Sequence, residues 1–280
     1  MAKIIQKEKL NATVIRMVVE AAFIAKKAKA GQFVILRVHK KGERFPLTIA
    51  DTDEKNGWVT IIFQLVGRST QMLNALVVGD EIEDFVGPLG TPSPLDGLKK
   101  VCVIGGGVGC AIAYPSAKQL YQNGSDVCVI AGFRNKDLKI LEKEFQQVSN
   151  KMYIMSDDGS VGEKGLVTNK LEALLLSGEQ FDEVIAIGPL IMMKFICELT
   201  KKYNVKTMVS MNPIMIDGTG MCGCCRLRVG GEMKFACVDG PDFDGHQIDF
   251  DEAMMRSKQY IQKEQIDRAK DCNLLARKVV

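Results

Sequence analysis

The segment Val101 to Cys110, V-C-V-I-G-G-G-V-G-C, is the most informative part of the sequence for the fold. An apolar run leads into closely spaced glycines, and a helix-compatible segment, A-I-A-Y-P-S-A-K-Q-L-Y, follows directly. Glycines between a strand and a helix let the backbone approach a pyrophosphate at the helix N-terminus. A tight turn without a ligand is the alternative reading, because Cys110 stands where the third glycine of G-x-G-x-x-G is usual. The predicted dinucleotide-binding residues of this turn are Gly105, Gly107, Val108 and Gly109.

Around this turn, from residue 98 to 210, buried apolar runs alternate with helical segments. Strands that alternate with helices predict a doubly wound parallel sheet, which binds ligands at the carboxyl edge of its strands. Arg134 stands where a ribose-binding carboxylate would be expected, so the sequence leaves NAD(H) or NADP(H) open. For the other candidate residues at this edge of the sheet, the alternative interpretations are that they lie in a solvated turn or in the core of a helix. The predicted cleft residues are Arg134, Asp157, Gly159, Gly188, Pro189 and Met192.

The preceding segment, residues 1–97, has the pattern of a small antiparallel barrel. Its β-branched, partly alternating runs are separated by Gly, Asp, Asn and Lys, and one short helix is expected at Ser69 to Val77. Within it, R-F-P-L-T at Arg44 to Thr48 places a guanidinium and a hydroxyl on one strand face, which suits a diphosphate. V-G-R-S-T offers a second anion-friendly helix start. The candidate residues are Arg44, Pro46, Leu47, Thr48, Val66, Gly67, Ser69 and Thr70.

The last seventy residues, 211–280, contain a glycine- and cysteine-rich loop, a hairpin-like stretch and a polar helix expected near Phe250 to Asp267. The loop spaces one aspartate and three cysteines as D-x4-C-x2-C-x11-C. Plant-type [2Fe-2S] loops use C-x4-C-x2-C with a distant fourth cysteine. A zinc site is chemically possible, and a redox disulfide between Cys222 and Cys225 is the least favoured reading. The predicted metal ligands are Asp217, Cys222, Cys225 and Cys237, with Cys224 supernumerary.

Composition narrows the class of protein. The chain of 280 residues has a 46% hydrophobic share and a formal charge of +3 without a basic block, so electrostatics suggest neither nucleic acid nor a membrane surface as partner. No apolar run reaches the roughly 18 residues of a membrane span, and the start M-A-K-I-I-Q-K-E-K lacks the apolar core of a secretion signal. We therefore expect a cytoplasmic protein, in which clustered cysteines indicate metal before disulfide.

The three motifs together resemble the ferredoxin reductase superfamily. Its barrel holds FAD through an R-x-Y-[ST] strand and a G-x-x-[ST] helix start, and the departure here is Pro46 in place of the stacking tyrosine. R-F-P-L-T-I, D-D-G-S, G-P-x-x-M-M-K, N-P-I-M-x-D-G-T-G-M-C-G and F-A-C-V-D-G-P-x-F resemble, over nearly the whole chain, the small subunit of NADH-dependent ferredoxin:NADP oxidoreductase.

That resemblance implies an oxidoreductase subunit with FAD, NAD(H) or NADP(H) and an Asp/Cys3 [2Fe-2S] cluster. It also implies docking on a larger flavin and [4Fe-4S] subunit, with ferredoxin reached through the complex. A nicotinamide carries electrons in pairs and a cluster carries them singly, so a flavin is needed to convert between them. No catalytic acid or base is assigned, and His39 and His246 are expected to be surface or hairpin histidines. The electron-transfer subunit of a type B dihydroorotate dehydrogenase is the alternative, although relatives there usually present four cysteines. A non-catalytic zinc or redox-sensing module is the third reading.

Overall fold

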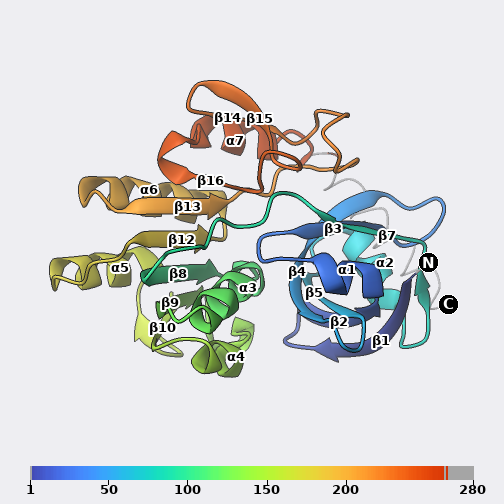
Figure 1. Cartoon of the computed structure of the whole chain (residues 1–280), viewed down its shortest axis with the longest axis horizontal. Helices are drawn as coiled ribbons and strands as arrows, with labels where there is room; N and C mark the ends of the chain where they lie inside the picture. The colour runs from blue at the N-terminus through green and yellow to red at the C-terminus, as the bar shows by residue number, and fades with distance from the viewer. Residues whose placement is uncertain (1, 262, 264–280) are drawn as a thin grey trace.

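The computed structural model describes residues 2–261 and 263 and shows two sheet-based units with a loop-rich region packed against both (Figure 1). The first unit is a nearly closed antiparallel barrel in the order β6-β1-β2-β5-β4-β3-β7. Alternating side chains fill its interior, where Met17, Ile61 and Phe63 are almost completely buried. Its elements are β1 Ala2–Lys9, β2 Val14–Glu20, α1 Ala22–Lys27, β3 Phe33–Arg37, β4 Arg44–Asp53, β5 Trp58–Gln64, α2 Arg68–Ala75, β6 Glu81–Ile82 and β7 Asp84–Leu89.

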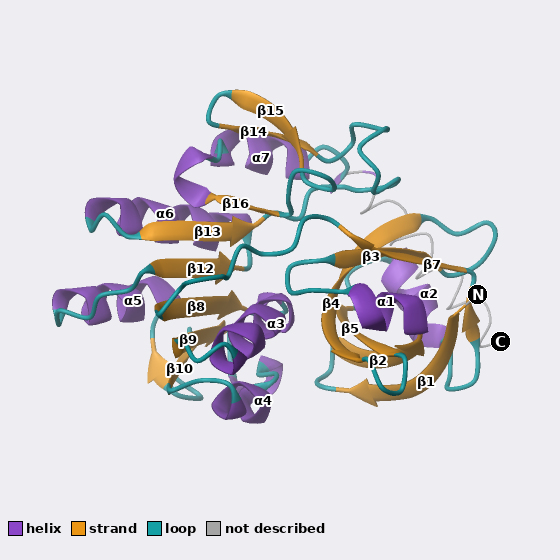
Figure 2. Cartoon of the chain, viewed as in Figure 1, coloured by secondary structure: helices purple, strands orange, loops and turns teal. Residues whose placement is uncertain are grey.

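The second unit is an α/β sheet in the order β11-β10-β9-β8-β12-β13-β16, parallel except for the edge strand β16. Helices α3 and α4 cover one face and α5 and α6 the other (Figure 2). The elements are β8 Lys100–Gly106, α3 Gly109–Gln122, β9 Asp126–Phe133, η1 Lys136–Leu138, α4 Glu142–Gln147, β10 Lys151–Ser156, β11 Glu163–Lys164, α5 Val167–Leu176, β12 Glu183–Ile187, α6 Leu190–Lys202 and β13 Lys206–Ser210. The predicted barrel and doubly wound sheet are both confirmed.

The C-terminal region follows β13 as a long loop. It contains the hairpin β14 Arg226–Val229 and β15 Glu232–Phe235, then β16 Asp242–Asp244, η2 Gly245–Gln247 and α7 Phe250–Ser257. Because β16 pairs with β13, this region adds a strand to the α/β sheet, which the sequence did not predict. The predicted domain boundaries at residues 97 and 210 stay a prediction. The helix expected near Phe250 to Asp267 lies partly outside the described residues, and that part also stays a prediction. The helix expected at Ser69 to Val77 is α2, which begins one residue earlier, at Arg68, and ends at Ala75.

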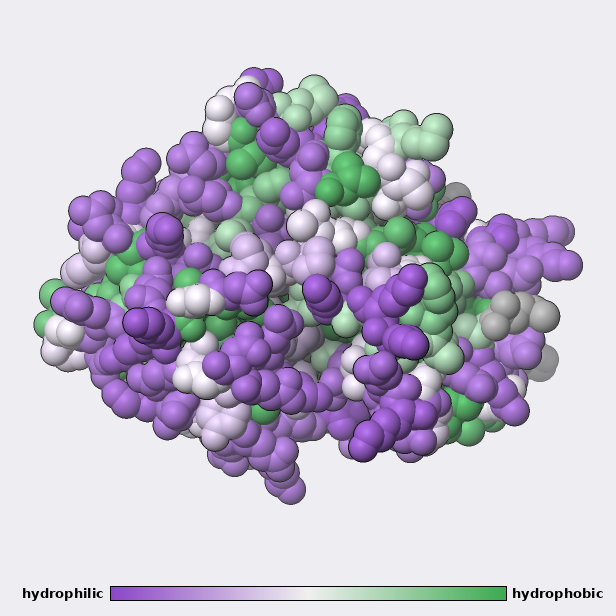
Figure 3. Space-filling view, viewed as in Figure 1, coloured by the Kyte–Doolittle hydropathy of each residue, from purple (hydrophilic) through white to green (hydrophobic). Residues whose placement is uncertain are grey.

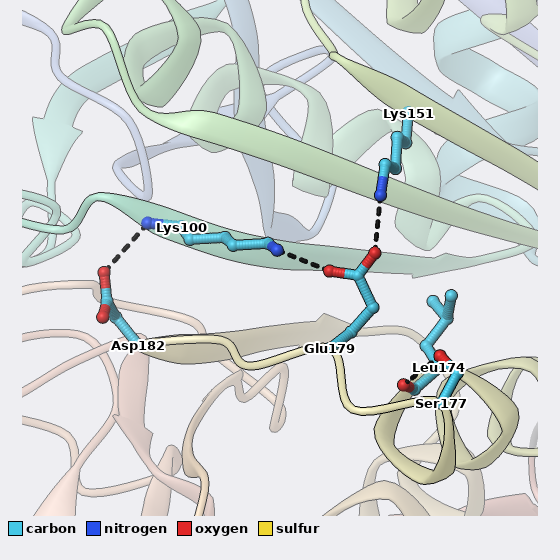
Figure 4. Close-up of polar contacts among 6 residues, drawn as sticks. All are labelled: Lys100, Lys151, Leu174, Ser177, Glu179 and Asp182. Atoms are coloured by element: carbon cyan, nitrogen blue, oxygen red, sulfur yellow. Dashed lines mark hydrogen bonds and ion pairs between the residues drawn. The ribbon is translucent and has the colours of Figure 1, made fainter.

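An ion-pair network links neighbouring strands of the α/β sheet at the edge opposite the glycine turn (Figure 4). Glu179, between α5 and β12, pairs with Lys100 of β8 and with Lys151 of β10, the latter at 2.5 Å. Asp182 accepts the backbone N–H groups of Lys99 and Lys100 at 2.7 and 2.9 Å. The two lysines hold the pKa of Glu179 at about 2. The chemistry-bearing residues lie at the other, carboxyl edge. Within the described part of the chain, no helix is long and apolar enough to cross a membrane.

Candidate functional site

The glycine turn forms a close backbone junction at the carboxyl edge of the sheet. A Cβ on Gly109 would lie 2.3 Å from the carbonyl oxygen of Ile187, so only glycine lets α3 start this close to β12. Gly107 has φ of +57° and open space where a Cβ would project. Gly109 therefore allows the helix to pack closely on the sheet, whereas the space beside Gly107 is available to a ligand.

The loop after β12 forms the second wall of this edge. A Cβ on Gly106 would lie 2.5 Å from Met192 Sδ, and one on Gly188 would lie 2.6 Å from Met192 Cε. The thioether of Met192 therefore covers both glycines, while Met193 turns inward and is 1% exposed. Pro189 precedes the first residue of α6. Of the two methionines, Met193 takes the helix-core role and Met192 lies at the predicted cleft.

Carboxylates flank the third part of the edge, where β9 and β10 end. The backbone N–H groups of Asp157 and Asp158 donate to the carbonyls of Phe133 and Arg134, at 3.1 and 3.3 Å. Ser160 Oγ accepts the N–H of Lys136 at 2.8 Å, which ties this turn to the loop after β9. Hydrogen bonds from Ser160 lower the pKa of Asp158, so its carboxylate is ionised at neutral pH. The end of β10 thus places two carboxylates next to the loop that follows β9.

The predicted flavin strand is β4, which pairs with β3. Arg44, Pro46 and Thr48 share one face by the two-residue strand period, opposite Arg37, Ile35 and Phe33 respectively. Leu47 faces the other way and packs against the barrel core, so its backbone is the part available to a cofactor. This alternation confirms the expected placement of the guanidinium and the hydroxyl on one face.

The start of α2 lies beside the start of β4. Ser69 Oγ donates to Glu43 at 2.7 Å, and Glu43 immediately precedes Arg44. Thr70 Oγ1 accepts the N–H groups of Val66 and Gly67, each at 3.1 Å, and so holds the turn that begins the helix. The two predicted halves of the flavin motif therefore meet, with the Thr70 hydroxyl shaping the loop.

In the cysteine loop, Cys225 and Cys237 form one buried pair, each 2% exposed. The N–H of Ala236 donates to the carbonyl of Cys225 at 3.1 Å, which brings the loop and β15 together. Burial and the neighbouring Cys225 thiol raise the pKa of Cys237 to about 12, although the N–H of Gly220 is directed at its sulfur and acts the other way. The Cys237 thiol therefore holds its proton at neutral pH, and a metal that binds its sulfur would have to displace that proton.

Half-buried Asp217 and exposed Cys222 form a second pair. The N–H of Cys224, and more weakly that of Asp217, is directed at the Cys222 sulfur and lowers the pKa of that thiol. The Asp217 carboxylate accepts the N–H of Thr219 at 3.1 Å through Oδ2, and Met221 N–H and the Thr219 hydroxyl reach the same oxygen. Backbone donors aimed at the sulfurs, within a glycine-rich loop, are the setting that an iron–sulfur cluster requires.

Two pairs suit two irons better than one metal ion. Among residues 2–261 and 263, no group of three or more His, Cys, Asp or Glu side chains is arranged to hold a single ion. A tetrahedral zinc site would need its donors around one point. A binuclear cluster takes two protein ligands on each iron, and the assignment of these four residues as its ligands stays a prediction.

The cysteine loop lies directly against the flavin motif. A Cβ on Gly218 would lie 2.8 Å from Ile35 Cγ1, and Ile35 is the register partner of Pro46. The charge of Arg44 contributes to lowering the pKa of Asp217, after the larger effect of the Thr219 hydrogen bonds. The barrel residues Ile35, Leu89 and Glu43 were missed in the sequence because apolar strand residues and an isolated glutamate carry no motif. Neither histidine joins this group: His39 contacts Met72 and His246 contacts Thr200.

Comparison with known proteins agrees with this geometry. Residues 212–249 match the iron-sulfur cluster binding domain of dihydroorotate dehydrogenase B. A Thermotoga maritima protein named as a homolog of the dihydroorotate dehydrogenase B (NAD(+)) electron transfer subunit is 44% identical, over 94% of this chain and 93% of that protein. The chain belongs to the family of dihydroorotate dehydrogenase B electron transfer subunits and their homologues. The predicted resemblance is thereby confirmed.

Two further members and relatives of this electron transfer subunit family are similar over almost their full length. An uncharacterised Clostridium beijerinckii protein from the adh 3' region is 49% identical, over 93% of this chain and 90% of the relative. A solved chain of the NADH-dependent reduced ferredoxin-NADP oxidoreductase superposes with a TM-score of 0.92 at 42% identity, covering 97% of this chain and 98% of that chain. The electron transfer subunit therefore has the same fold as that oxidoreductase chain over almost its full length.

Proposed function

We propose that this electron transfer subunit carries electrons between NAD(H), a flavin on the barrel and a [2Fe-2S] cluster, and then to a larger subunit. The observation that carries the proposal is the contact of Gly218 with Ile35, because it joins the predicted cluster loop to the predicted flavin strand. The flavin supplies the conversion between paired and single electrons.

The geometry supports a set of residues for each of the three groups. Arg44 and Thr48 would bind FAD from one face of β4, and the turn at Gly67 to Thr70 would bind from α2. The glycine turn, with Gly188 and Met192 opposite, would hold the dinucleotide. Asp217 with Cys222, and Cys225 with Cys237, would hold the two irons. Orientation of the reacting rings by these surfaces, without a titrating side chain, is sufficient for hydride transfer.

The carboxylates at the end of β10 favour NAD(H) over NADP(H). Asp157 and Asp158 lie beside Phe133 and Arg134, where the adenosine ribose of a bound dinucleotide would end. A 2′-phosphate would bring negative charge toward two aspartates, and like charges at short range repel. We expect kcat/KM for NADH to exceed that for NADPH, and Asp158→Ser to reduce the ratio. An unchanged ratio in this variant would contradict the role of Asp158.

A larger flavin and [4Fe-4S] subunit is the proposed partner, with ferredoxin served through the complex. Apolar side chains are exposed along the cysteine loop (Figure 3), where Met221 is 89% exposed. Contiguous exposed apolar residues on a folded protein mark interaction surfaces. Ile214, Ile216, Met221 and Val238 would be covered by that subunit.

Anaerobic purification tests the proposal. Bound flavin, two iron and two sulfide per chain, and bleaching by NADH are expected. Stoichiometric zinc without flavin would contradict it and favour the zinc module. The second candidate, a subunit of a dihydroorotate dehydrogenase, is favoured by the names of the relatives. It would be supported if the copurifying large subunit oxidised dihydroorotate, whereas ferredoxin- and NADP-dependent turnover of the complex would support the first.

A further inference from the structure

A carboxyl group lies at the junction of all three parts of the chain. Asp242 begins β16, and its Oδ1 is enclosed by protein, with the side chain of Ser210, its register partner on β13, beside the carboxyl. Burial raises the pKa of Asp242. An enclosed carboxyl without a cationic partner costs free energy, so its placement calls for an explanation in its contacts.

The contact of Asp242 is with the linker between the two large units. Ser93, between β7 and β8, donates its hydroxyl to Asp242 Oδ2. The N–H of Ser93 in turn donates to the carbonyl of Ala30 at 2.9 Å, just before β3. A Cβ on Gly31 would lie 2.2 Å from Ser93 Oγ and 3.2 Å from Asp242 Oδ2, so the pair packs onto the barrel backbone. Asp242 is therefore anchored to the barrel through Ser93.

The same linker also holds the chain between Asp242 and the nearest predicted ligand. The N–H of Thr91 donates to the carbonyl of Gly240 at 2.6 Å, and its hydroxyl donates to the carbonyl of Val238 at 3.1 Å. Val238 directly follows Cys237. On the other side, the N–H of Met211 donates to the carbonyl of Pro241 at 2.9 Å, at the start of the cysteine loop. Both ends of the predicted cluster-binding region thus converge on the segment that Asp242 anchors.

We propose that Asp242 is a positioning residue that fixes Cys237, and with it the predicted cluster, relative to the flavin-binding barrel. The inference rests on the proposed function for its role in electron transfer. Once the side-chain anchor is removed, we expect water to compete for the hydrogen bonds that the carbonyls of Gly240 and Val238 accept. Small displacements of reacting groups cause large losses of rate, so loss of the anchor should slow passage of electrons between flavin and cluster.

The test compares four variants of the full-length chain, purified anaerobically with its cofactors. Asp242→Ala removes the anchor, and Asp242→Asn keeps an acceptor for the Ser93 hydroxyl. Ser93→Ala removes the same bond from the other side. Asp244→Ala is the matched control, since Asp244 is an exposed carboxylate on the same strand, and its Oδ1 accepts the N–H of His246 at 2.9 Å.

After mixing with NADH, flavin and cluster absorbance are followed separately. We expect Asp242→Ala to slow cluster reduction about tenfold or more, with flavin reduction within about twofold of wild type. Ser93→Ala should act in the same direction, and Asp242→Asn and Asp244→Ala should stay within about twofold. Wild-type rates of cluster reduction in folded Asp242→Ala or Ser93→Ala would overturn the inference, as would a defect equally large in Asp244→Ala. If Asp242→Ala does not fold, the rate of cluster reduction in Ser93→Ala tests the inference.

A second measurement does not need the cofactors. Amide hydrogen exchange on the cofactor-free chain should show loss of protection at Thr91 and Met211 in Asp242→Ala, with the sheet core at Val103 unchanged. Unaltered protection at Thr91 would overturn the anchoring role. If NADH does not bleach the cluster of the wild-type protein, the result counts against the proposed function. The hydrogen-exchange result then tests the anchoring role of Asp242 separately.

Discussion

Gly218 approaches Ile35 so closely that a Cβ on the glycine would stand 2.8 Å from Ile35 Cγ1 and 2.9 Å from Leu89 Cδ1. The glycine follows Asp217, a predicted ligand, and the isoleucine lies opposite Pro46 in the predicted flavin strand. One contact therefore determines how near the cysteine loop comes to the barrel. Gly218 also has φ of +81°, which glycine adopts readily.

Gly218→Ala should displace the loop and reduce the iron content. The added methyl group overpacks Ile35, which costs about 1–3 kcal/mol, and the left-handed backbone adds roughly 1–2 kcal/mol. Iron and sulfide analysis should show a clear loss while flavin is retained. Gly231→Ala is the control, because Gly231 has φ of +83° in the β14–β15 turn and open space around its Cβ position. Equal iron content in both variants would show that the contact is unimportant.

Asp217→Ala should lose the cluster, because one of the four proposed ligands is removed. Asp217→Cys should retain it with a changed reduction potential, since a thiolate donates more charge to iron than a carboxylate does. Iron and sulfide content and the redox titration check both outcomes. Asp239→Ala serves as the control, because it removes a nearby carboxylate that is not a proposed ligand. Full iron and sulfide content in Asp217→Ala would show the ligand assignment to be wrong.

Gly107→Ala should weaken NADH binding without removing flavin or iron. Open space surrounds the Cβ position, so the protein itself accommodates the methyl group, whereas a pyrophosphate in the turn would collide with it. We expect KM for NADH to rise about tenfold or more, equivalent to a loss of about 1.4 kcal/mol. Gly124→Ala, at φ of +86° and also with open space, controls for backbone strain in the same sheet unit. The same KM in both variants would contradict dinucleotide binding at this turn.

Glu183→Gln should stabilise the protein at alkaline pH. Burial raises the pKa of Glu183 to about 7, although Lys206 acts in the opposite direction. The folded state then binds a proton that the unfolded state has already released, so stability falls as pH rises from about 4.5 to 7. At pH 8.5 the variant should gain on the order of 1–2 kcal/mol in free energy of unfolding, after allowance for solvent screening. At pH 4 the two proteins should differ little.

Urea denaturation at the two pH values measures the difference. Glu172→Gln removes an exposed carboxylate from α5 and should show no comparable gain. A wild-type protein whose stability increases between pH 5 and 7 through Glu183 would contradict the prediction.

Much of the architecture could be predicted because local patterns carry it. The alternation of apolar and polar residues gave the barrel, and the run V-C-V-I followed by glycines gave the α/β sheet. The cysteine spacing likewise gave the candidate ligands. Two features could not be predicted from such patterns. β16 joins the sheet through pairing of Phe243 with Val209, and Ser93 reaches Asp242 across 149 positions.

Sequence patterns alone predicted most of the helices and strands, and they located each candidate ligand on a particular turn, strand or loop. The reason is that helix and strand periods, glycine turns and ligand spacings act over a few residues. The packing of the whole chain was needed to show that the cysteine loop lies on β3 and β7, that the end of β10 brings carboxylates beside Arg134, and that Asp242 contacts the linker at Ser93. Contacts of this kind depend on how whole sheets pack, and Ile35, Leu89 and Ser93 acquire their roles from their neighbours in space.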